Sequence, residues 1–86
     1  MKHFEYTITD PIGIHARPAG LLAKAAKALN SVVTVGKPGT EPVSASRLMA
    51  LMSMGIKRGD TVTITVDGGD ENANFQLMKQ FFEENL

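Results

Sequence analysis

The clearest chemical signal in the chain is a histidine placed just before a predicted helix. His15 stands in the stretch GIHARPAG, residues 13–20, and Arg17 follows two positions later. Pro18 fits only the first turn of a helix, so the helix should begin beside His15. The free N–H groups and the dipole of a helix start form an anion site, which favours a neutral, nucleophilic imidazole. With the Arg17 guanidinium as a phosphate ligand, this pattern predicts phosphoryl transfer through His15.

A lone histidine near a helix start is also compatible with simpler roles, as a helix cap or a solvated surface residue. The residue types around it alone do not decide between these roles. The only other histidine is His3, and the chain has no cysteine, so no metal site is expected at His15.

A second signal is a short predicted helix with almost no polar face. Residues 47–54 read RLMALMSM, whereas a surface helix in a small domain should be amphipathic. Leu51 and Met54 are expected in the core. Exposed methionine and leucine suit adaptable protein contacts. We therefore predict a docking surface that includes Leu21, Leu48, Met49 and Met52.

The elements that must position these residues follow from hydrophobic periodicity and turn residues. They are strands at 2–9, 32–35, 41–44 and 61–67, and helices at about 16–29, at 47–54 and from 71 to near the C-terminus. The order β-α-β-β-α-β-α predicts a single α+β domain over residues 1–86, built as a two-layer sandwich.

Several residues are expected to cap the helices or to mark an edge strand. Pro42 favours an edge position for the third strand. Ser46 is predicted as the N-cap and Gly55 as the C-cap of the short helix, and Asp70 as the N-cap of the last helix. The packing residues of that last helix are expected to be Leu77, Met78, Phe81 and Phe82.

Composition limits the function classes. The 86 residues carry nine basic and nine acidic side chains, so attraction to nucleic acid is not implied. Residues 1–50 hold six of the basic and three of the acidic side chains, which suits an acidic or phosphorylated partner near His15. The absence of cysteine, of a signal-peptide pattern and of a membrane-spanning run leads us to expect a cytoplasmic protein.

The motif GIHARPA at residues 13–19 resembles the phosphorylation motif of the HPr family, the histidine-containing phosphocarriers of the bacterial phosphoenolpyruvate-dependent sugar phosphotransferase system. The resemblance covers the whole chain, including its length, its element order and the segment MSMGI at 52–56. It implies an open-faced β-sandwich, with a four-stranded antiparallel sheet and three helices on one face.

The resemblance also implies a function and partners. His15 would accept a phosphoryl group from phosphorylated Enzyme I, on the Nδ1 atom, and pass it to the IIA domain of a sugar permease. Arg17 would stabilise the phosphate. The chain would act as a carrier without a cofactor rather than as an enzyme. Because its docking face must stay open, we expect a monomer. The matching docking positions are Gly20, Leu21, Lys24, Lys27, Leu48, Met49 and Met52.

One departure concerns regulation. In many members of the family, a kinase phosphorylates a serine at the start of the second helix. An ungapped alignment from the segment at 52–56 places Arg47 at that position, so we expect the regulatory site to be lost. Ser46 would take its role only if the alignment shifts by one residue.

Three other functions stay open. An enzyme that uses His15 as nucleophile or base is disfavoured, because the sequence near His15 offers no obvious carboxylate partner and the domain has little room for a pocket. A regulatory module of the same fold would be expected to lack the histidine. A nitrogen-branch phosphocarrier would share the chemistry and differ in its Enzyme I and its outputs.

Overall fold

Seven elements follow one another in the computed structural model, which describes residues 1–86. They are β1 (Lys2–Thr7), α1 (Ala16–Lys27), β2 (Val32–Gly36), β3 (Val43–Ser44), α2 (Leu48–Ser53), β4 (Thr61–Asp67) and α3 (Glu71–Asn85). The predicted order β-α-β-β-α-β-α is confirmed. The first helix ends at Lys27, two residues earlier than predicted, and the first strand ends at Thr7.

The four strands form one antiparallel sheet in the order β1-β4-β2-β3. β4 is central, and its Ile64 lies opposite Phe4 of β1 and Val35 of β2. The alternation of β4 buries every second side chain, as a sheet with one covered face requires. β3 lies at the edge of the sheet directly after Pro42, which confirms the predicted edge position.

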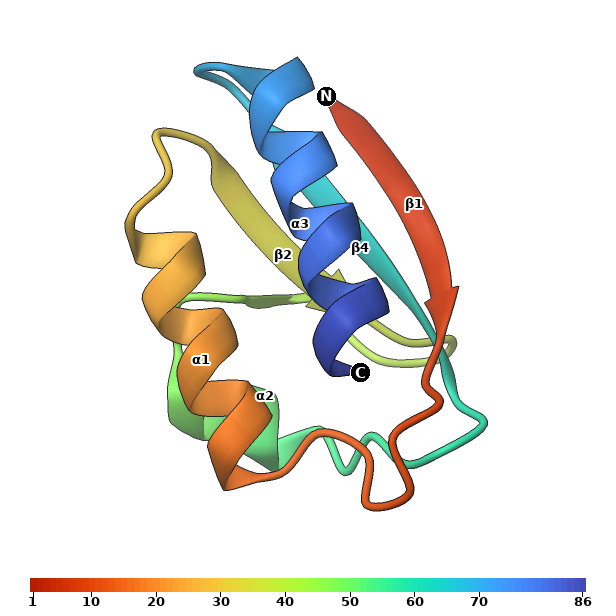
Figure 1. The fold of residues 1–86 in the computed structure, drawn as a ribbon. Helices are drawn as coiled ribbons and strands as arrows, with labels where there is room; N and C mark the ends of the chain where they lie inside the picture. The colour runs from red at the N-terminus through yellow and green to blue at the C-terminus, as the bar shows by residue number, and fades with distance from the viewer.

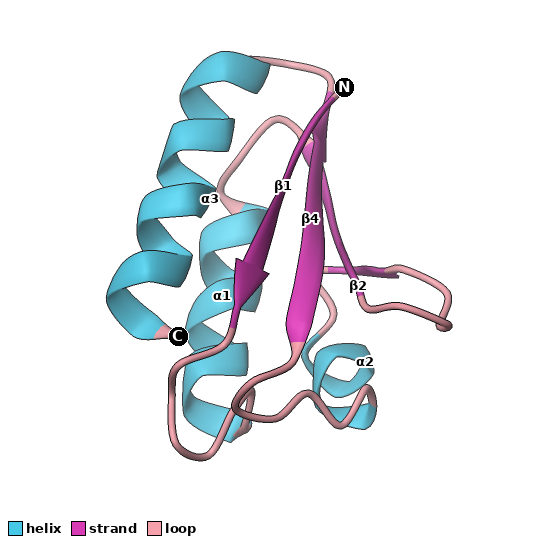
Figure 2. Cartoon of the chain, turned by 90° about the vertical axis from the view of Figure 1, so that its right-hand side faces the viewer, coloured by secondary structure: helices cyan, strands magenta, loops and turns pink.

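The helices form the second layer. α1 and α3 lie over the same face of the sheet, and the short α2 lies beside α1 near the end of the sheet (Figures 1 and 2). Large apolar side chains fill the space between the layers. The largest that are fully buried are Ile8, Leu22, Val35, Leu51, Val62, Ile64, Val66, Met78 and Phe82. The predicted α+β fold, a four-stranded antiparallel sheet with three helices, is confirmed.

The packing face of α3 is narrower than predicted. Asn74, Met78 and Phe82 are its buried residues, and their spacing of four marks one stripe along the helix. Phe81 is partly buried, whereas Leu77 is 51% exposed, so the prediction for Leu77 was wrong. One helical step separates Leu77 from Met78, and this step turns its side chain away from the core.

The predicted helix caps were only partly right. Asp70 occupies the N-cap position of α3, but its side chain makes no capping hydrogen bond. The N-cap position of α2 is Arg47, so the prediction for Ser46 was wrong. The Ser46 hydroxyl instead lies 2.8 Å from the hydroxyl of Ser44, in a hydrogen bond between the two side chains. Gly55 follows the C-cap residue by one position, with a φ of 65° that suits glycine.

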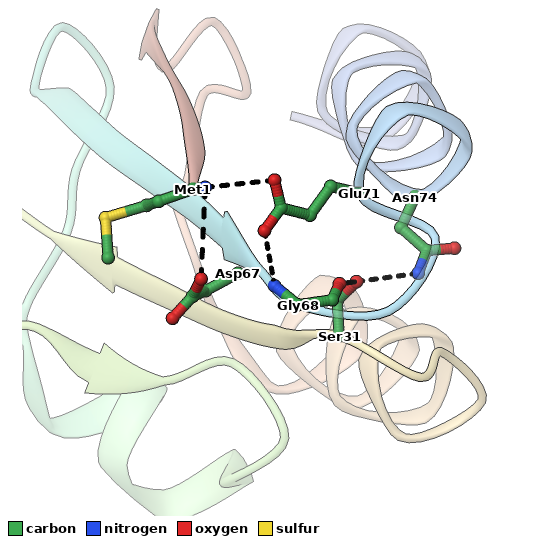
Figure 3. Close-up of polar contacts among 6 residues, drawn as sticks. All are labelled: Met1, Ser31, Asp67, Gly68, Glu71 and Asn74. Carbon is green, nitrogen blue, oxygen red and sulfur yellow. Dashed lines mark hydrogen bonds and ion pairs between the residues drawn. The ribbon is translucent and has the colours of Figure 1, made fainter.

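A polar cluster ties the start of α3 to the residue before β1, the residue before β2 and the end of β4 (Figure 3). Glu71 accepts a hydrogen bond from the Gly68 N–H at 2.6 Å and pairs with the α-ammonium of Met1 at 2.9 Å. The Gly68 hydrogen bond, followed by the nearby ammonium, lowers the pKa of Glu71 below its ordinary value. The buried Asn74 donates to the Ser31 hydroxyl at 2.8 Å, which in turn donates to the Gly68 carbonyl.

Candidate functional site

The loop before α1 is fixed by its main chain. The Ile14 N–H donates to the Ile56 carbonyl at 3.1 Å, and the Ile14 side chain is buried. Gly13 has a φ of 83°, and a Cβ at this position would overlap the Ile56 carbonyl oxygen. Only glycine tolerates both the positive φ and the lack of space for a Cβ. Gly13 therefore lets the loop pack against residues 56–57, and this packing sets the position of His15.

His15 itself occupies the N-cap position of α1, as the sequence predicted. Its backbone is extended, and its carbonyl accepts the Ala19 N–H at 2.9 Å. Its side chain makes no capping hydrogen bond and is 35% exposed. The role of helix cap, which the sequence left open, therefore does not apply. The side chain therefore leaves the first N–H groups of α1 uncapped, and these groups have no acceptor within the helix.

The imidazole borders a hollow of about 250 Å³ at the surface. Three parts of the chain meet there: the β1–α1 loop, the first turns of α1 and the C-terminal end of α3, which reaches toward that loop in Figure 1. The residues that line it are Asp10, His15, Arg17, Pro18, Leu21, Glu84 and Asn85. The walls are mostly polar, as befits a site for a small charged group rather than for an apolar ligand.

Asp10 is the nearest acidic neighbour of the histidine. Its Oδ1 lies 3.9 Å from the His15 Nε2 and also accepts the Ile12 N–H at 2.9 Å. The expectation that His15 lacks a carboxylate partner was therefore wrong. The turn at Asp10-Pro11-Ile12 was the available signal, since an aspartate that accepts the N–H two residues ahead folds back on its own loop. Glu84 could not be found in this way, because it comes from the other end of the chain.

Arg17 lies in the first turn of α1, where the sequence placed it. Its side chain is exposed, borders the same hollow as His15 and forms no ion pair in the structure. The hollow thus combines one arginine with the helix N-terminus, a combination suited to binding a phosphate group.

The predicted docking residues lie on α1 and α2, which pack beside each other. Leu21, Leu48 and Met52 are each about two fifths exposed, and Met49 is 75% exposed. Lys24 and Lys27 are exposed, and Gly20 is partly exposed. The exposure expected of Leu21, Leu48, Met49 and Met52 is confirmed, as is the burial of Leu51, while Met54 is partly buried.

One apolar residue of this region was missed. Ile12 is 68% exposed in the loop that carries His15. A single isoleucine between a proline and a glycine shows no hydrophobic periodicity, so its exposure could not be predicted from the sequence.

Two further observations bear on cofactors and membranes. No group of three or more histidine, cysteine, aspartate or glutamate side chains is arranged to hold a metal ion. None of the three helices has the length and apolar character needed to cross a bilayer.

Comparison with known proteins gives consistent matches over nearly the whole chain. A family model described as the PTS HPr component phosphorylation site matches residues 2–84. The phosphocarrier protein HPr of Mycoplasma genitalium is 39% identical over 85 residues, which cover 99% of this chain and 97% of the relative.

Solved structures agree with this match. A histidine-containing phosphocarrier protein from a structural study of Mycoplasma divergence superposes with a TM-score of 0.90 and 36% identity, over 96% of this chain and 93% of that one. An HPr structure from Thermoanaerobacter tengcongensis gives a TM-score of 0.89 and 31% identity, over 98% and 93% of the two chains.

Proposed function

This chain belongs to the HPr family of the phosphotransferase system, and we propose that His15 is the residue on which it carries the phosphoryl group. The family membership makes it a phosphocarrier of sugar uptake and not a turnover enzyme, so the hypothesis of a stand-alone enzyme is set aside. The observation that supports His15 is its free imidazole at the start of α1, beside a polar hollow.

The chemistry we propose is nucleophilic. A ring nitrogen of His15 forms a bond to phosphorus while the bond from phosphorus to the donor breaks, and the reverse reaction delivers the group to an acceptor. Because Nε2 faces Asp10, Nδ1 is the nitrogen left to carry the group. The phosphate oxygens would then receive hydrogen bonds from the first N–H groups of α1 and from Arg17, which stabilise their charge.

Membership of the family implies Enzyme I and IIA domains as partners. We propose that donor and acceptor use one surface in turn. Its residues are Gly20, Leu21, Lys24, Lys27, Leu48, Met49 and Met52. The surface combines exposed apolar side chains with lysines, so it offers both contact area and attraction to an acidic partner. We propose that the chain works as a monomer, because the docking face must stay open to both partners. We also propose that it acts in the cytoplasm.

We also propose that the regulatory serine of the family is absent. Arg47 holds the N-cap position of α2, and the hydroxyl of the half-buried Ser46 is hydrogen-bonded to Ser44. Incubation with a kinase of the HPr type and ATP is expected to leave Ser46 unmodified. A phosphoserine at position 46 in the mass spectrum of a tryptic digest would overturn this proposal.

The experiment that tests His15 is intact mass spectrometry after incubation with phosphoenolpyruvate and Enzyme I. The wild type is expected to gain one acid-labile phosphoryl group and His15→Ala none. His3→Ala is the matched control, because His3 is exposed on β1 and should leave the gain unchanged. Phosphorylation of His15→Ala, or none in the wild type with an Enzyme I that is active on another HPr, would contradict the proposal.

A further inference from the structure

Three hydrogen bonds hold Asp10 in the loop before α1. Its N–H donates to the main-chain oxygen of Leu86 at 2.8 Å, and its own carbonyl accepts the Gly13 N–H at 3.0 Å. Its Oδ1 accepts the Ile12 N–H at 2.9 Å. These three hydrogen bonds fix both the backbone and the carboxylate. The same Oδ1 lies 3.9 Å from the His15 Nε2, so its position relative to the ring is set by the fold.

The other charged groups at the hollow are arranged differently. Glu84 reaches it from α3, but its Oε2 accepts a hydrogen bond from Gln80 at 3.1 Å, one turn earlier on the same helix. Arg17 reaches it from α1 and forms no ion pair. Asp10 is therefore the only charged group whose contact with the imidazole falls within ion-pair range.

We propose that Asp10 is a positioning residue that keeps the proton of the His15 ring on Nε2. This inference rests on the proposed role of His15. In the free protein, a proton on Nε2 leaves the lone pair on Nδ1, which is the nucleophilic form. A carboxylate that orients a histidine and selects its tautomer is a recurrent device in nucleophilic sites.

In the phosphorylated protein, Asp10 favours the form of the ring that releases its group. When an acceptor atom bonds to phosphorus, the bond from phosphorus to Nδ1 breaks and its electron pair returns to the ring. With a proton on Nε2, the ring leaves as neutral imidazole, and without it as an imidazolate anion, which is a much poorer leaving group. A carboxylate about 4 Å away favours the protonated form. Asp10 thus extends the transfer-competent form to higher pH.

The decisive variant is Asp10→Asn, whose amide oxygen can still accept the Ile12 N–H while the negative charge is removed. The measurement is the rate at which phosphorylated protein loses its group to water, followed as a function of pH without any partner. The hydrolysis rate should fall as rising pH removes the proton from Nε2. We expect the pH midpoint of this fall to be lower in Asp10→Asn than in the wild type, by about half a unit to one unit at low ionic strength.

Glu84→Gln is the matched control. It removes a carboxylate that lines the same hollow but forms no ion pair with the His15 Nε2. It should move the midpoint by clearly less than Asp10→Asn. An Asp10→Asn profile that coincides with the wild type, or an equal shift in Glu84→Gln, would overturn the inference.

Two further measurements separate the ways in which the experiment can fail. If wild-type His15 takes no phosphoryl group, the proposed function fails and not the role of Asp10. If Asp10→Asn does not fold, Asp10→Ser, whose hydroxyl can also accept the Ile12 N–H, replaces it. Nitrogen NMR shifts of the unphosphorylated ring should show less of the Nε2-protonated tautomer in either variant, and an unchanged tautomer ratio would refute the inference.

Discussion

At the scale of single residues, the main chain fixes the position of His15, while its imidazole makes no capping hydrogen bond and lies 3.9 Å from Asp10. Gly13 allows the loop to pack on Ile56, and the His15 carbonyl accepts a hydrogen bond from the Ala19 N–H in the first turn of α1. A nucleophile fixed in this way loses little conformational freedom when it meets a partner. Such preorganisation lowers the entropic cost of transfer.

Arg17→Ala tests the remaining charged group of the hollow. Loss of a charge-assisted hydrogen bond to phosphate is expected to slow phosphoryl transfer from Enzyme I about tenfold to a hundredfold. Rapid-quench measurement of phosphorylated protein provides the rate. Arg58→Ala removes an exposed arginine from the turn before β4 and should leave the rate unchanged. A normal rate in Arg17→Ala would exclude this residue from phosphate binding.

At the scale of elements, the sequence could predict what depends on local pattern. The helix start at His15 and Pro18 and the order of the elements along the chain needed only neighbouring residues and simple periodicity. The caps of α2 and α3 were harder, because several polar residues competed for each position. Ser46 found a hydrogen-bond partner in Ser44, and Glu71 rather than Asp70 bonded the turn before α3. The outcome depended on contacts that sequence spacing does not reveal.

The short helix α2 carries Met49, the most exposed apolar residue of the predicted docking surface. Met49→Asp should weaken binding to Enzyme I about tenfold or more, because a carboxylate replaces an apolar contact, while the chemistry at His15 stays intact. Isothermal titration measures the affinity. Leu77→Asp is a matched control, since Leu77 is a large exposed apolar residue on α3, which carries none of the predicted docking residues. Equal affinities for Met49→Asp and the wild type would show that α2 is not the interface.

At the scale of the whole molecule, the two ends of the chain lie at different sites. The α-ammonium of Met1 pairs with Glu71 at the start of α3, whereas the main-chain oxygen of Leu86 accepts hydrogen bonds from Thr9 and Asp10 in the loop before His15. The sequence could not predict either contact, because each joins segments far apart in the chain. Glu84 was not predicted at the site for the same reason, because it lies far from His15 in the sequence.

The cluster at Glu71 makes stability depend on pH. The pKa of Glu71 is lower in the folded chain than its ordinary value of 4.5, so its contribution is complete above that value and is lost as pH falls through the folded value. Glu71→Gln should therefore be less stable than the wild type at pH 7, and the difference should vanish at strongly acidic pH. Urea unfolding at both pH values measures this difference.

The matched control for this prediction is Glu83→Gln, which changes an exposed carboxylate on the same helix. Its stability relative to the wild type should not vary with pH in the same way. A Glu71→Gln deficit that is equal at neutral and acidic pH would mean that the residue acts through packing and not through its charge.

The graded exposure of the methionines has a consequence for oxidative stress. Met49 and Met52 lie open on the predicted docking surface, Met1 is open at the opposite end of the sheet, and Met78 is 2% exposed in the core. Peroxide converts an accessible thioether to a polar sulfoxide, with water as the other product. Mild peroxide should therefore slow phosphorylation by Enzyme I before it unfolds the chain. Leucine at positions 49 and 52 should abolish that sensitivity, and reductase treatment should restore the rate.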